Sequence, residues 1–208
     1  MYKIKEIYYT IQGEGFHTGK AAVFCRFSGC NLWSGREEDR AKAICQFCDT
    51  NFWGMDGENG GSYSIAELVN KCNEVWKGGA SDKFIVFTGG EPILQLDFEL
   101  LESFKKAGYY TAVETNGTLP CPENLDWICM SPKANTDIVQ SSGNECKVVH
   151  PQKGMNPIEF EKMDFDHFYL QPMDNEDQMT NIASCVEFCK SNPKWKLSLQ
   201  THKLIGIS

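Results

Sequence analysis

The segment that decides the fold is CRFSGCNLWSGREEDRAKAICQFCDT, residues 25–50. It holds four cysteines, and three of them, Cys30, Cys45 and Cys48, follow the spacing C-x14-C-x2-C. A structural zinc site generally takes four protein ligands, whereas three thiolates on a four-iron cluster leave one iron open to a further ligand. Cys25 is the candidate fourth zinc ligand, but its place in the strand-like run VFCRF favours packing in the core. The segment therefore predicts a reactive iron–sulfur cluster, with a zinc site or unrelated cysteines as the open alternatives.

The composition is that of a globular protein with one domain. The chain has 208 residues, of which 41% are hydrophobic and 23% charged, so it can bury one full-sized core. A net charge of −8 argues against a nucleic-acid partner. The N-terminal sequence lacks a signal-peptide pattern and no apolar run is long enough for a membrane span, so we expect a cytoplasmic protein. In that reducing compartment the ten cysteines are expected to be thiols or ligands.

Apolar runs separated by turn signals predict an α/β domain with a largely parallel sheet, because such runs suit strands buried on both faces. The expected strands are residues 23–27, 83–87, 110–114, 126–130, 145–149, 168–170 and 196–200. Helical periodicity appears at residues 64–76, 97–108 and 180–190. Ser64 and Glu67 predict a capping box for the first helix, and Asp97 and Gly108 predict the ends of the second. The cysteines outside the motif are expected to pack in the core.

A second motif, TGGEP at residues 88–92, follows the expected strand 83–87. Gly89 and Gly90 lack side chains, so the backbone there can approach a ligand closely and present its carbonyl oxygens to an ammonium group. With the aromatic Phe47 before the last cysteine, this pattern resembles the radical S-adenosylmethionine (SAM) superfamily. In those enzymes a Gly-Gly-Glu motif contacts the methionine amino group of SAM. Their usual cysteine spacing is C-x3-C-x2-C, so the gap of fourteen residues departs from it.

The N-terminal run YYTIQGEGFHTGKAAVFCRFSGCN resembles the 7-carboxy-7-deazaguanine synthase family, radical SAM enzymes of the pathway to queuosine. Over nearly the whole chain QGEG, FCRFSGCNLW, CDT, TGGEP, ETNG, SPKA, KVV, QPMD and QTHK match a branch of that family, which shares the fourteen-residue gap. The resemblance implies an incomplete TIM-like barrel of about six parallel strands and three helices. It also implies a single domain, residues 1–208, with a cluster-binding insertion at about 28–62, and a homodimer.

The reaction implied by the resemblance is a ring contraction. It converts 6-carboxy-5,6,7,8-tetrahydropterin to 7-carboxy-7-deazaguanine with loss of ammonia. The implied cofactors are a 4Fe-4S cluster, SAM and Mg²⁺, and the implied partner is an electron donor such as flavodoxin or ferredoxin. Because the SAM radical carries the chemistry, the protein is expected to bind, orient and protect the reactants and to supply no catalytic side chain.

Residue roles follow from the same resemblance. Cys30, Cys45 and Cys48 match the cluster ligands and Thr50 the Mg²⁺ ligand, although a threonine there could also be a turn residue. Arg26 is the candidate for the substrate carboxylate, with a surface ion pair as its alternative. The positions that match the substrate pocket are Ile11, Gln12, Gly13, Glu14, Arg26, Thr88, His202 and Ser208, where one known relative ends in proline instead. Those that match the SAM site are Gly90, Glu114, Ser131, Pro132, Lys133, Gln171, Pro172, Met173 and Asp174.

Two alternatives remain at this point. An activating enzyme for a glycyl-radical protein would share the cluster and SAM but act on a protein partner, so it would not need QGEG, Arg26 and QTHK as a small-molecule pocket. A non-enzymatic zinc-binding module would use Cys25 as its fourth ligand.

Overall fold

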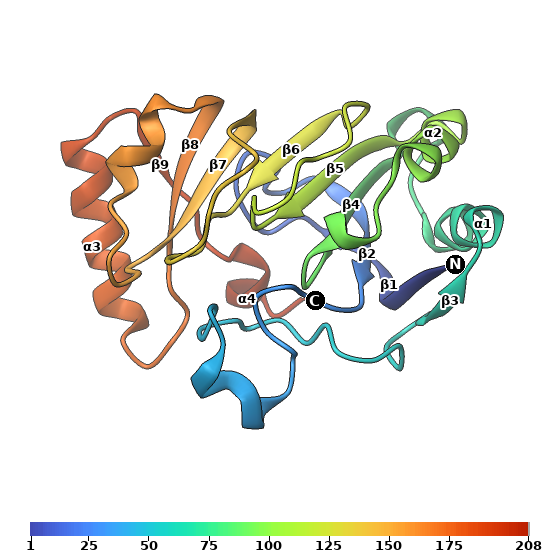
Figure 1. The fold of residues 1–208 in the computed structure, drawn as a ribbon. Helices are drawn as coiled ribbons and strands as arrows, with labels where there is room; N and C mark the ends of the chain where they lie inside the picture. Colours follow the sequence, from blue (N-terminus) through green and yellow to red (C-terminus); the bar gives the residue numbers. More distant parts are fainter. Residues whose placement is uncertain (208) are drawn as a thin grey trace.

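The computed structural model describes residues 1–207, which form one nine-stranded sheet with helices on its outer surface (Figure 1). The strand order is β3-β1-β2-β4-β5-β6-β7-β8-β9. The strands are β1 (Tyr2–Ile11), β2 (Ala21–Phe27), β3 (Gly61–Tyr63), β4 (Phe84–Gly89), β5 (Tyr110–Thr115), β6 (Trp127–Met130), β7 (Ser142–His150), β8 (Asp164–Pro172) and β9 (Trp195–Leu197). The helices are α1 (Ile65–Val75), α2 (Phe98–Lys106), α3 (Gln178–Ser191) and α4 (Thr201–Ile205). Short 3-10 helices lie at η1 (Glu37–Lys42), η2 (Ala80–Asp82), η3 (Pro92–Leu94) and η4 (Pro157–Lys162).

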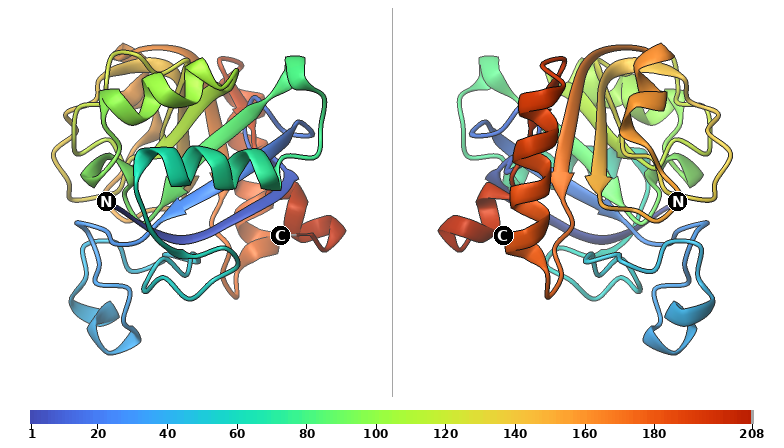
Figure 2. Two further views of the ribbon diagram at one scale, coloured as in Figure 1. Left: turned by 90° about the vertical axis from the view of Figure 1, so that its right-hand side faces the viewer. Right: turned by 90° about the vertical axis from the view of Figure 1, so that its left-hand side faces the viewer.

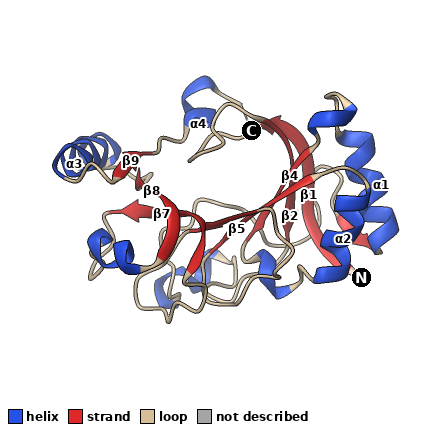
Figure 3. Ribbon diagram, turned by 90° about the horizontal axis from the view of Figure 1, so that it is seen from above, coloured by secondary structure: helices blue, strands red, loops and turns tan. Residues whose placement is uncertain are grey.

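Most of the sheet is parallel. Parallel pairing runs from β2 to β4 and on to β9, whereas β1 pairs antiparallel with both β2 and β3 at one edge. Within residues 1–207 this gives seven parallel strands, and they curve into an arc whose two ends do not meet (Figure 3). The arrangement confirms the predicted incomplete α/β barrel, for which about six parallel strands were expected.

The two faces of the curved sheet have different roles, because successive residues of a strand point to opposite sides. On β2, Cys25 belongs to the outer core while its neighbour Arg26 lines an inner cavity. On β7, Cys146 belongs to the outer core near α3 while Lys147 lines the same cavity. The outer face therefore carries most of the packing, while the inner face holds a smaller apolar cluster that includes Ala22, Val86 and Ala112, and polar groups line its cavity.

The helices cover the outer face in two places. α1 and α2 lie together over the end of the sheet that contains β1 to β5, and α3 covers β8 and β9 (Figure 2). The predicted capping box of α1 is confirmed, since Ser64 accepts from the Glu67 backbone N–H and Glu67 accepts from that of Ser64. Asp97 caps α2 by accepting from the Leu100 N–H at 2.9 Å, also as predicted. The three helices follow the predicted segments closely.

The strands β1 and β3 and the last helix, α4, were not predicted from the sequence. In β1 the pairing register shifts between Ile4 and Glu6, so Ile4 and Ile7 are both fully buried although they are three residues apart. Such a bulge hides the period of two by which a strand is recognised. The predicted strand 196–200 is shorter than expected, because the chain leaves the sheet after Leu197.

The cysteines outside the motif take the places expected of small apolar side chains. Cys25, Cys72, Cys146 and Cys185 are fully buried and Cys129 nearly so. Within residues 1–207 all ten cysteines are free thiols. None of the helices in this range combines the length and the apolar character needed to cross a bilayer.

Candidate active site

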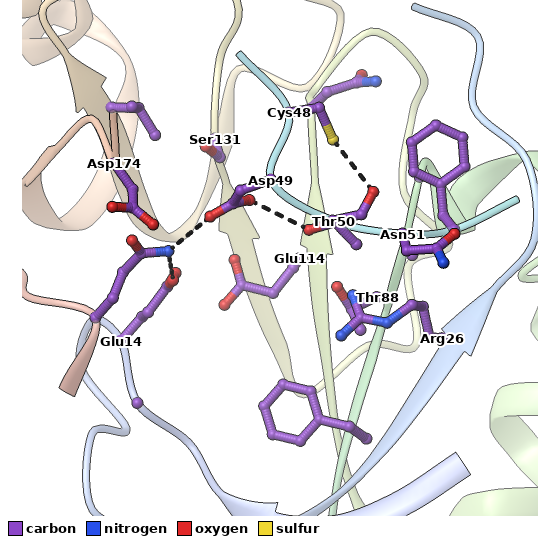
Figure 4. A pocket seen from close by; sticks show the side chains of 18 of the residues that line it. Glu14, Arg26, Cys48, Asp49, Thr50, Asn51, Thr88, Glu114, Ser131 and Asp174 are labelled. Atoms are coloured by element: carbon purple, nitrogen blue, oxygen red, sulfur yellow. Dashed lines mark hydrogen bonds between the residues drawn. The ribbon is translucent and has the colours of Figure 1, made fainter. Parts of the chain in front are cut away.

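A cavity of about 540 Å³ opens at the carboxyl ends of the parallel strands. Parallel α/β folds generally bind ligands at this edge, and the size suits a small-molecule site. Figure 4 shows Arg26 and Thr88 on one side of the cavity, Glu14 and Asp174 on the other, and Glu114 between them. These five side chains come from segments far apart in the sequence, so the barrel brings them together.

Nearly all the residues proposed from the sequence line this cavity. Pro132 and Met173 lie beside it, where the Pro132 carbonyl accepts from Gln152 at 3.2 Å and the Met173 N–H donates to the His150 carbonyl at 2.8 Å. Ser208 lies outside the described residues. The proposed residues that do line the cavity are Ile11, Gln12, Gly13, Glu14, Arg26, Cys30, Cys45, Cys48, Thr50, Thr88, Gly90, Glu114, Ser131, Lys133, Gln171, Pro172, Asp174 and His202.

The three motif cysteines reach the cavity from two segments, Cys30 from the turn after β2 and Cys45 and Cys48 from the loop after η1. Burial raises the pKa of all three thiols; neighbouring thiol charges add to the rise at Cys30 and Cys45, and the Asp49 charge adds to it at Cys48. The Leu32 N–H donates to the Cys30 sulfur at 3.4 Å, and the Lys133 ammonium opposes the rise in the pKa values of Cys45 and Cys48. Within residues 1–207 no three His, Cys, Asp or Glu side chains converge to hold a single metal ion. Three separate thiols beside a cation fit the edges of an anionic polynuclear cluster.

Cys25 lies on the opposite face of β2 from this cavity. Its side chain is fully buried in the outer core together with Cys72 of α1, and burial raises its pKa well above the ordinary value. Because strand residues alternate between faces, Cys25 cannot turn toward the cavity while Arg26 lines it. The structure therefore contradicts the zinc alternative in which Cys25 is the fourth ligand.

Gly89 and Gly90 are required by contacts within the chain itself. A Cβ at Gly89 would overlap the Phe27 carbonyl oxygen, and one at Gly90 would overlap the Gly29 carbonyl oxygen and lie 2.6 Å from the Cβ of Cys30. The interpretation that these glycines leave room for a ligand is thus incomplete, because they first let β4 approach the turn that carries Cys30.

The glutamate of the TGGEP motif is a structural residue. Glu91 is fully buried and its carboxylate accepts from the Thr115 hydroxyl at 2.8 Å, the Asn116 N–H at 2.7 Å and the Ile93 N–H at 3.0 Å. Burial raises its pKa, while these hydrogen bonds oppose the rise. Glu91 does not line the cavity, whereas Thr88, Gly89 and Gly90 of the same motif do.

The two ends of the chain meet at the cavity. The Thr201 N–H and hydroxyl both donate to the Gly13 carbonyl, at 2.9 and 2.8 Å, and His202 packs so closely on Gly13 that a Cβ there would overlap its ring. Gln200 donates to Glu14 at 3.0 Å. The QGEG and QTHK motifs, distant in the sequence, therefore form one wall.

Lys147 is the centre of the acidic part of the cavity. Its ammonium donates to Glu14 at 2.8 Å and to both oxygens of Glu114 at 2.9 and 3.0 Å, and its side chain is only 3% exposed. Burial alone would raise the pKa of Glu14, but the Lys147 charge and hydrogen bonds from Lys147 and Gln200 hold it below its ordinary value. The Glu14 carboxylate is therefore an acceptor at neutral pH.

Arg26 stands on the other side of the cavity. Its Nε donates to Glu6 at 2.7 Å and its terminal nitrogen to the Tyr8 hydroxyl at 2.9 Å. The ion pair foreseen as an alternative for Arg26 does exist, but it lies inside the cavity and orients the guanidinium, since its side chain is 16% exposed. The remaining N–H groups can still meet a carboxylate.

Thr50 lies next to an acidic residue at the mouth of the cavity. Its hydroxyl donates to Asp49 at 3.4 Å, and Asp49 also accepts from Gln200 at 3.1 Å and pairs with Lys203. Lys203 pairs in turn with Asp174 at 2.6 Å. Hard cations prefer such oxygen ligands, and a hydroxyl alone is a modest one.

Several lining residues were missed by the sequence analysis, namely Asp49, Lys147, Gln200 and Lys203. The signal for Lys147 was present in the run ECKVV, where a lysine alternates with buried apolar residues in a strand. A charged side chain at such a position must face a polar interior. The other three residues lie in loops and a short helix, whose positions depend on long-range contacts.

Comparison with known proteins assigns the family. A model of the Radical SAM superfamily matches residues 40–139. The chain is 55% identical to the 7-carboxy-7-deazaguanine synthase of Caulobacter vibrioides and 52% identical to that of Burkholderia multivorans, over 99% of this chain and 99% of each relative. The chain belongs to the 7-carboxy-7-deazaguanine synthase family.

The fold agrees with this membership. The crystal structure of QueE from Escherichia coli matches it with a TM-score of 0.71 over 95% of this chain and 93% of that one, at 23% identity. As a family member the protein is a radical SAM enzyme of the queuosine pathway, and the family implies a 4Fe-4S cluster and SAM as cofactors. The predicted identity as an enzyme is confirmed, and the glycyl-radical alternative finds no support among these relatives.

Proposed function

We propose that the protein converts 6-carboxy-5,6,7,8-tetrahydropterin to 7-carboxy-7-deazaguanine and ammonia. The observation that carries the proposal is that one cavity joins the three motif cysteines to a guanidinium, Arg26, and an ionised carboxylate, Glu14. The pterin has complementary groups, a carboxylate at one end and a guanidine-like N–H edge at the other. The name of these relatives, 7-carboxy-7-deazaguanine synthase, agrees with this product.

The pterin lies between these two charged groups in the proposal. Glu14 and the Gln12 side chain accept from and donate to the guanidine-like edge, since a carboxylate matches paired N–H donors. Arg26, held by Glu6, binds the substrate carboxylate with its free N–H groups. His202 closes the wall beside Gly13. Ile11, Gly13, Thr88 and the terminal Ser208 complete the proposed substrate pocket.

The residues proposed for the cofactors lie in or beside the same cavity. Cys30, Cys45 and Cys48 would hold the cluster, and the presence of all three thiols in one cavity supports this assignment. The cluster and SAM together supply the radical that begins the reaction. The chain binds SAM through the cofactor residues named from the sequence, with Pro132 and Met173 acting through the backbone around them. These residues orient both reactants and keep water out, so no side chain need act as acid or base.

Further parts of the proposal rest on the family resemblance and on chemistry. We place Mg²⁺ at Thr50, with the substrate and water as its other ligands, because Thr50 lines the cavity beside Asp49. The single domain carries the cluster in the insertion at about 28–62. A homodimer in the cytoplasm, reduced by a flavodoxin or ferredoxin, completes the proposal, and free thiols suit that compartment.

The test is an anaerobic assay of the reconstituted enzyme with SAM, dithionite, Mg²⁺ and the pterin. We expect 7-carboxy-7-deazaguanine by mass spectrometry, and no product from Cys45→Ala, whose iron content and cluster absorbance also fall. Cys146→Ala is the matched control, because Cys146 is buried in the outer core, away from the cavity. Formation of 5'-deoxyadenosine with the pterin unchanged would mean that the substrate is wrong. A full cluster that cleaves no SAM would overturn the whole proposal.

A further inference from the structure

Lys147 is a buried cation to which the proposed reaction gives no role. It lies on β7, where its neighbours Cys146 and Val148 pack in the outer core, so its own side chain points into the barrel. Removing an ammonium group from water costs several kcal/mol, and a buried ion pair is often no more stabilising than apolar packing. Fold stability alone therefore does not explain a lysine at this position.

All three N–H donors of Lys147 are directed at two carboxylates that come from different elements of the fold. Glu14 belongs to the loop after β1 and Glu114 to β5. Both lie within 3.0 Å of the same nitrogen atom, so their oxygens are no more than about 6 Å apart, a distance at which two carboxylates repel each other. The ammonium between them removes that repulsion.

Each carboxylate faces a different proposed ligand. Glu14 is the candidate acceptor for the pterin edge, and Glu114 is one of the residues proposed to bind SAM. Gln12 extends the same network, because its amide donates to Glu114 at 3.3 Å and its carbonyl oxygen accepts from the Glu14 N–H at 3.2 Å. Lys147 thus connects the substrate side of the cavity to the cofactor side through contacts of hydrogen-bond length.

We propose that Lys147 is a positioning residue that fixes the Glu14 carboxylate toward the pterin and the Glu114 carboxylate toward SAM, and so couples the two binding sites. The identity of the two ligands rests on the proposed function. Without the ammonium, the two carboxylates move apart or share a proton, and a protonated carboxyl accepts fewer hydrogen bonds. Both ligands then bind less tightly, although Lys147 touches neither of them.

The experiment measures two dissociation constants on the anaerobically reconstituted enzyme, one for SAM alone and one for the pterin alone. Lys147→Met is expected to weaken both by about 10-fold or more, and Lys147→Arg to restore part of each affinity, because it returns the charge. The control is Lys105→Met, which removes a lysine from an ion pair outside the cavity, with Asp126 at 2.7 Å. Because the Lys105 ammonium bonds to Asp126 and does not line the cavity, this variant is expected to bind both ligands within about twofold of wild type.

If Lys147→Met does not fold, a second pair of variants tests the same coupling. Glu14→Gln and Glu114→Gln each remove one partner of the ammonium, and each is expected to change the affinity for the ligand of the other site at least about threefold. Unchanged cross-site affinities in both variants would overturn the coupling. So would a folded Lys147→Met enzyme that binds both ligands normally, or one that loses affinity for a single ligand.

Failure of the positioning role is distinguishable from failure of the proposed function. If the substrate assignment is wrong, wild type does not bind the pterin, yet SAM affinity still falls in Lys147→Met. If the positioning role is wrong, wild type converts the pterin and Lys147→Met binds SAM and pterin as wild type does.

Discussion

Gly90 is the residue at which the cluster segment and the sheet come closest. Its lack of a side chain lets β4 pass against the turn that carries Cys30, so the glycine sets the position of a proposed cluster ligand. Glu91, next to it, joins the ends of β4 and β5 through Thr115 and Asn116. A short motif thereby fixes three neighbouring segments at the mouth of the barrel.

Gly90→Ala is expected to destabilise the fold by about 1–3 kcal/mol, because the new Cβ must displace backbone. The displaced turn carries Cys30, so the iron content after reconstitution should also fall. Thermal unfolding and iron analysis measure the two effects. Gly79→Ala is the control, since Gly79 has φ −67° and its Cβ would meet nothing closer than Asp82 at 3.9 Å. Equal iron content in both variants would contradict the prediction.

Because Glu145 is a buried carboxyl group, we expect the free energy of unfolding to depend on pH. Burial raises the pKa of this carboxyl from 4.5 to about 7, and one of its oxygens has no hydrogen-bond partner. Between these values the folded state holds a proton that the unfolded state has released. Stability therefore falls as pH rises through about 7, by up to about 3 kcal/mol.

Glu145→Gln isolates this contribution, because an amide does not titrate. From pH 5.5 to 8.5 the melting temperature of wild type should fall by about 4–8 °C relative to the variant, because about 2 kcal/mol of the change lies within this range. The amide oxygen can still accept from the Phe16 N–H, as the carboxylate does at 3.2 Å. Melting temperatures that change in parallel over this range would mean that Glu145 titrates as an ordinary carboxyl.

The sequence predicted the identities of individual site residues better than it predicted the interactions between them. The spacing of Cys30, Cys45 and Cys48 and the resemblance to a family identified positions that the structure brings to one cavity. The resemblance did not reveal Lys147, because its role depends on Glu14 and Glu114, which lie on other elements. Sequence patterns identify candidate side chains, but they do not show which carboxylates form ion pairs with the same lysine.

At the scale of elements, α4 differs from the other helices. None of its five residues is buried, so it has no apolar face to anchor it. It is held by the contacts of Thr201 with Gly13 and by the pairs of Lys203 with Asp49 and Asp174. A short helix fixed by distant polar groups carries no periodic signal, and this is why α4 was not predicted while α1 and α2 were.

Lys203→Met is expected to loosen α4. Partly exposed ion pairs contribute up to about 1 kcal/mol each, so the amides of residues 201–205 should exchange with solvent roughly fivefold faster. Hydrogen exchange with mass spectrometry measures this rate, and high salt should have part of the same effect on wild type. Lys190→Met removes the exposed pair with Glu187 on α3 and serves as the control. Unchanged exchange in α4 would show that Thr201 alone holds the helix.

At the scale of the whole molecule, the open barrel is completed by the two ends of the chain. The sheet does not close between its edges, and the loop after β1 meets the segment after β9 instead. Gly15 donates to the Ser198 hydroxyl at 2.9 Å, and Thr201 donates to the Gly13 carbonyl. The barrel type followed from the apolar runs and the motifs. The closure by QGEG and QTHK did not, because only the folded chain brings them together.

Because the C-terminal segment closes the barrel beside the proposed substrate pocket, removal of residues 201–208 should weaken substrate binding more than it weakens the fold. The sheet and its three cores contain none of the described residues of this segment, so the melting temperature and the cluster absorbance should change little. The affinity for SAM should fall less than that for the pterin, through loss of the pair between Lys203 and Asp174. The pterin should bind at least about 10-fold more weakly, because His202 and the contact that orders Gly13 are lost. Equilibrium binding of each ligand to the truncated, reconstituted enzyme measures the difference. Unchanged pterin affinity would place the substrate away from this wall, and a lost cluster would mean that the C-terminal segment supports the cysteine loop through Asp49 instead.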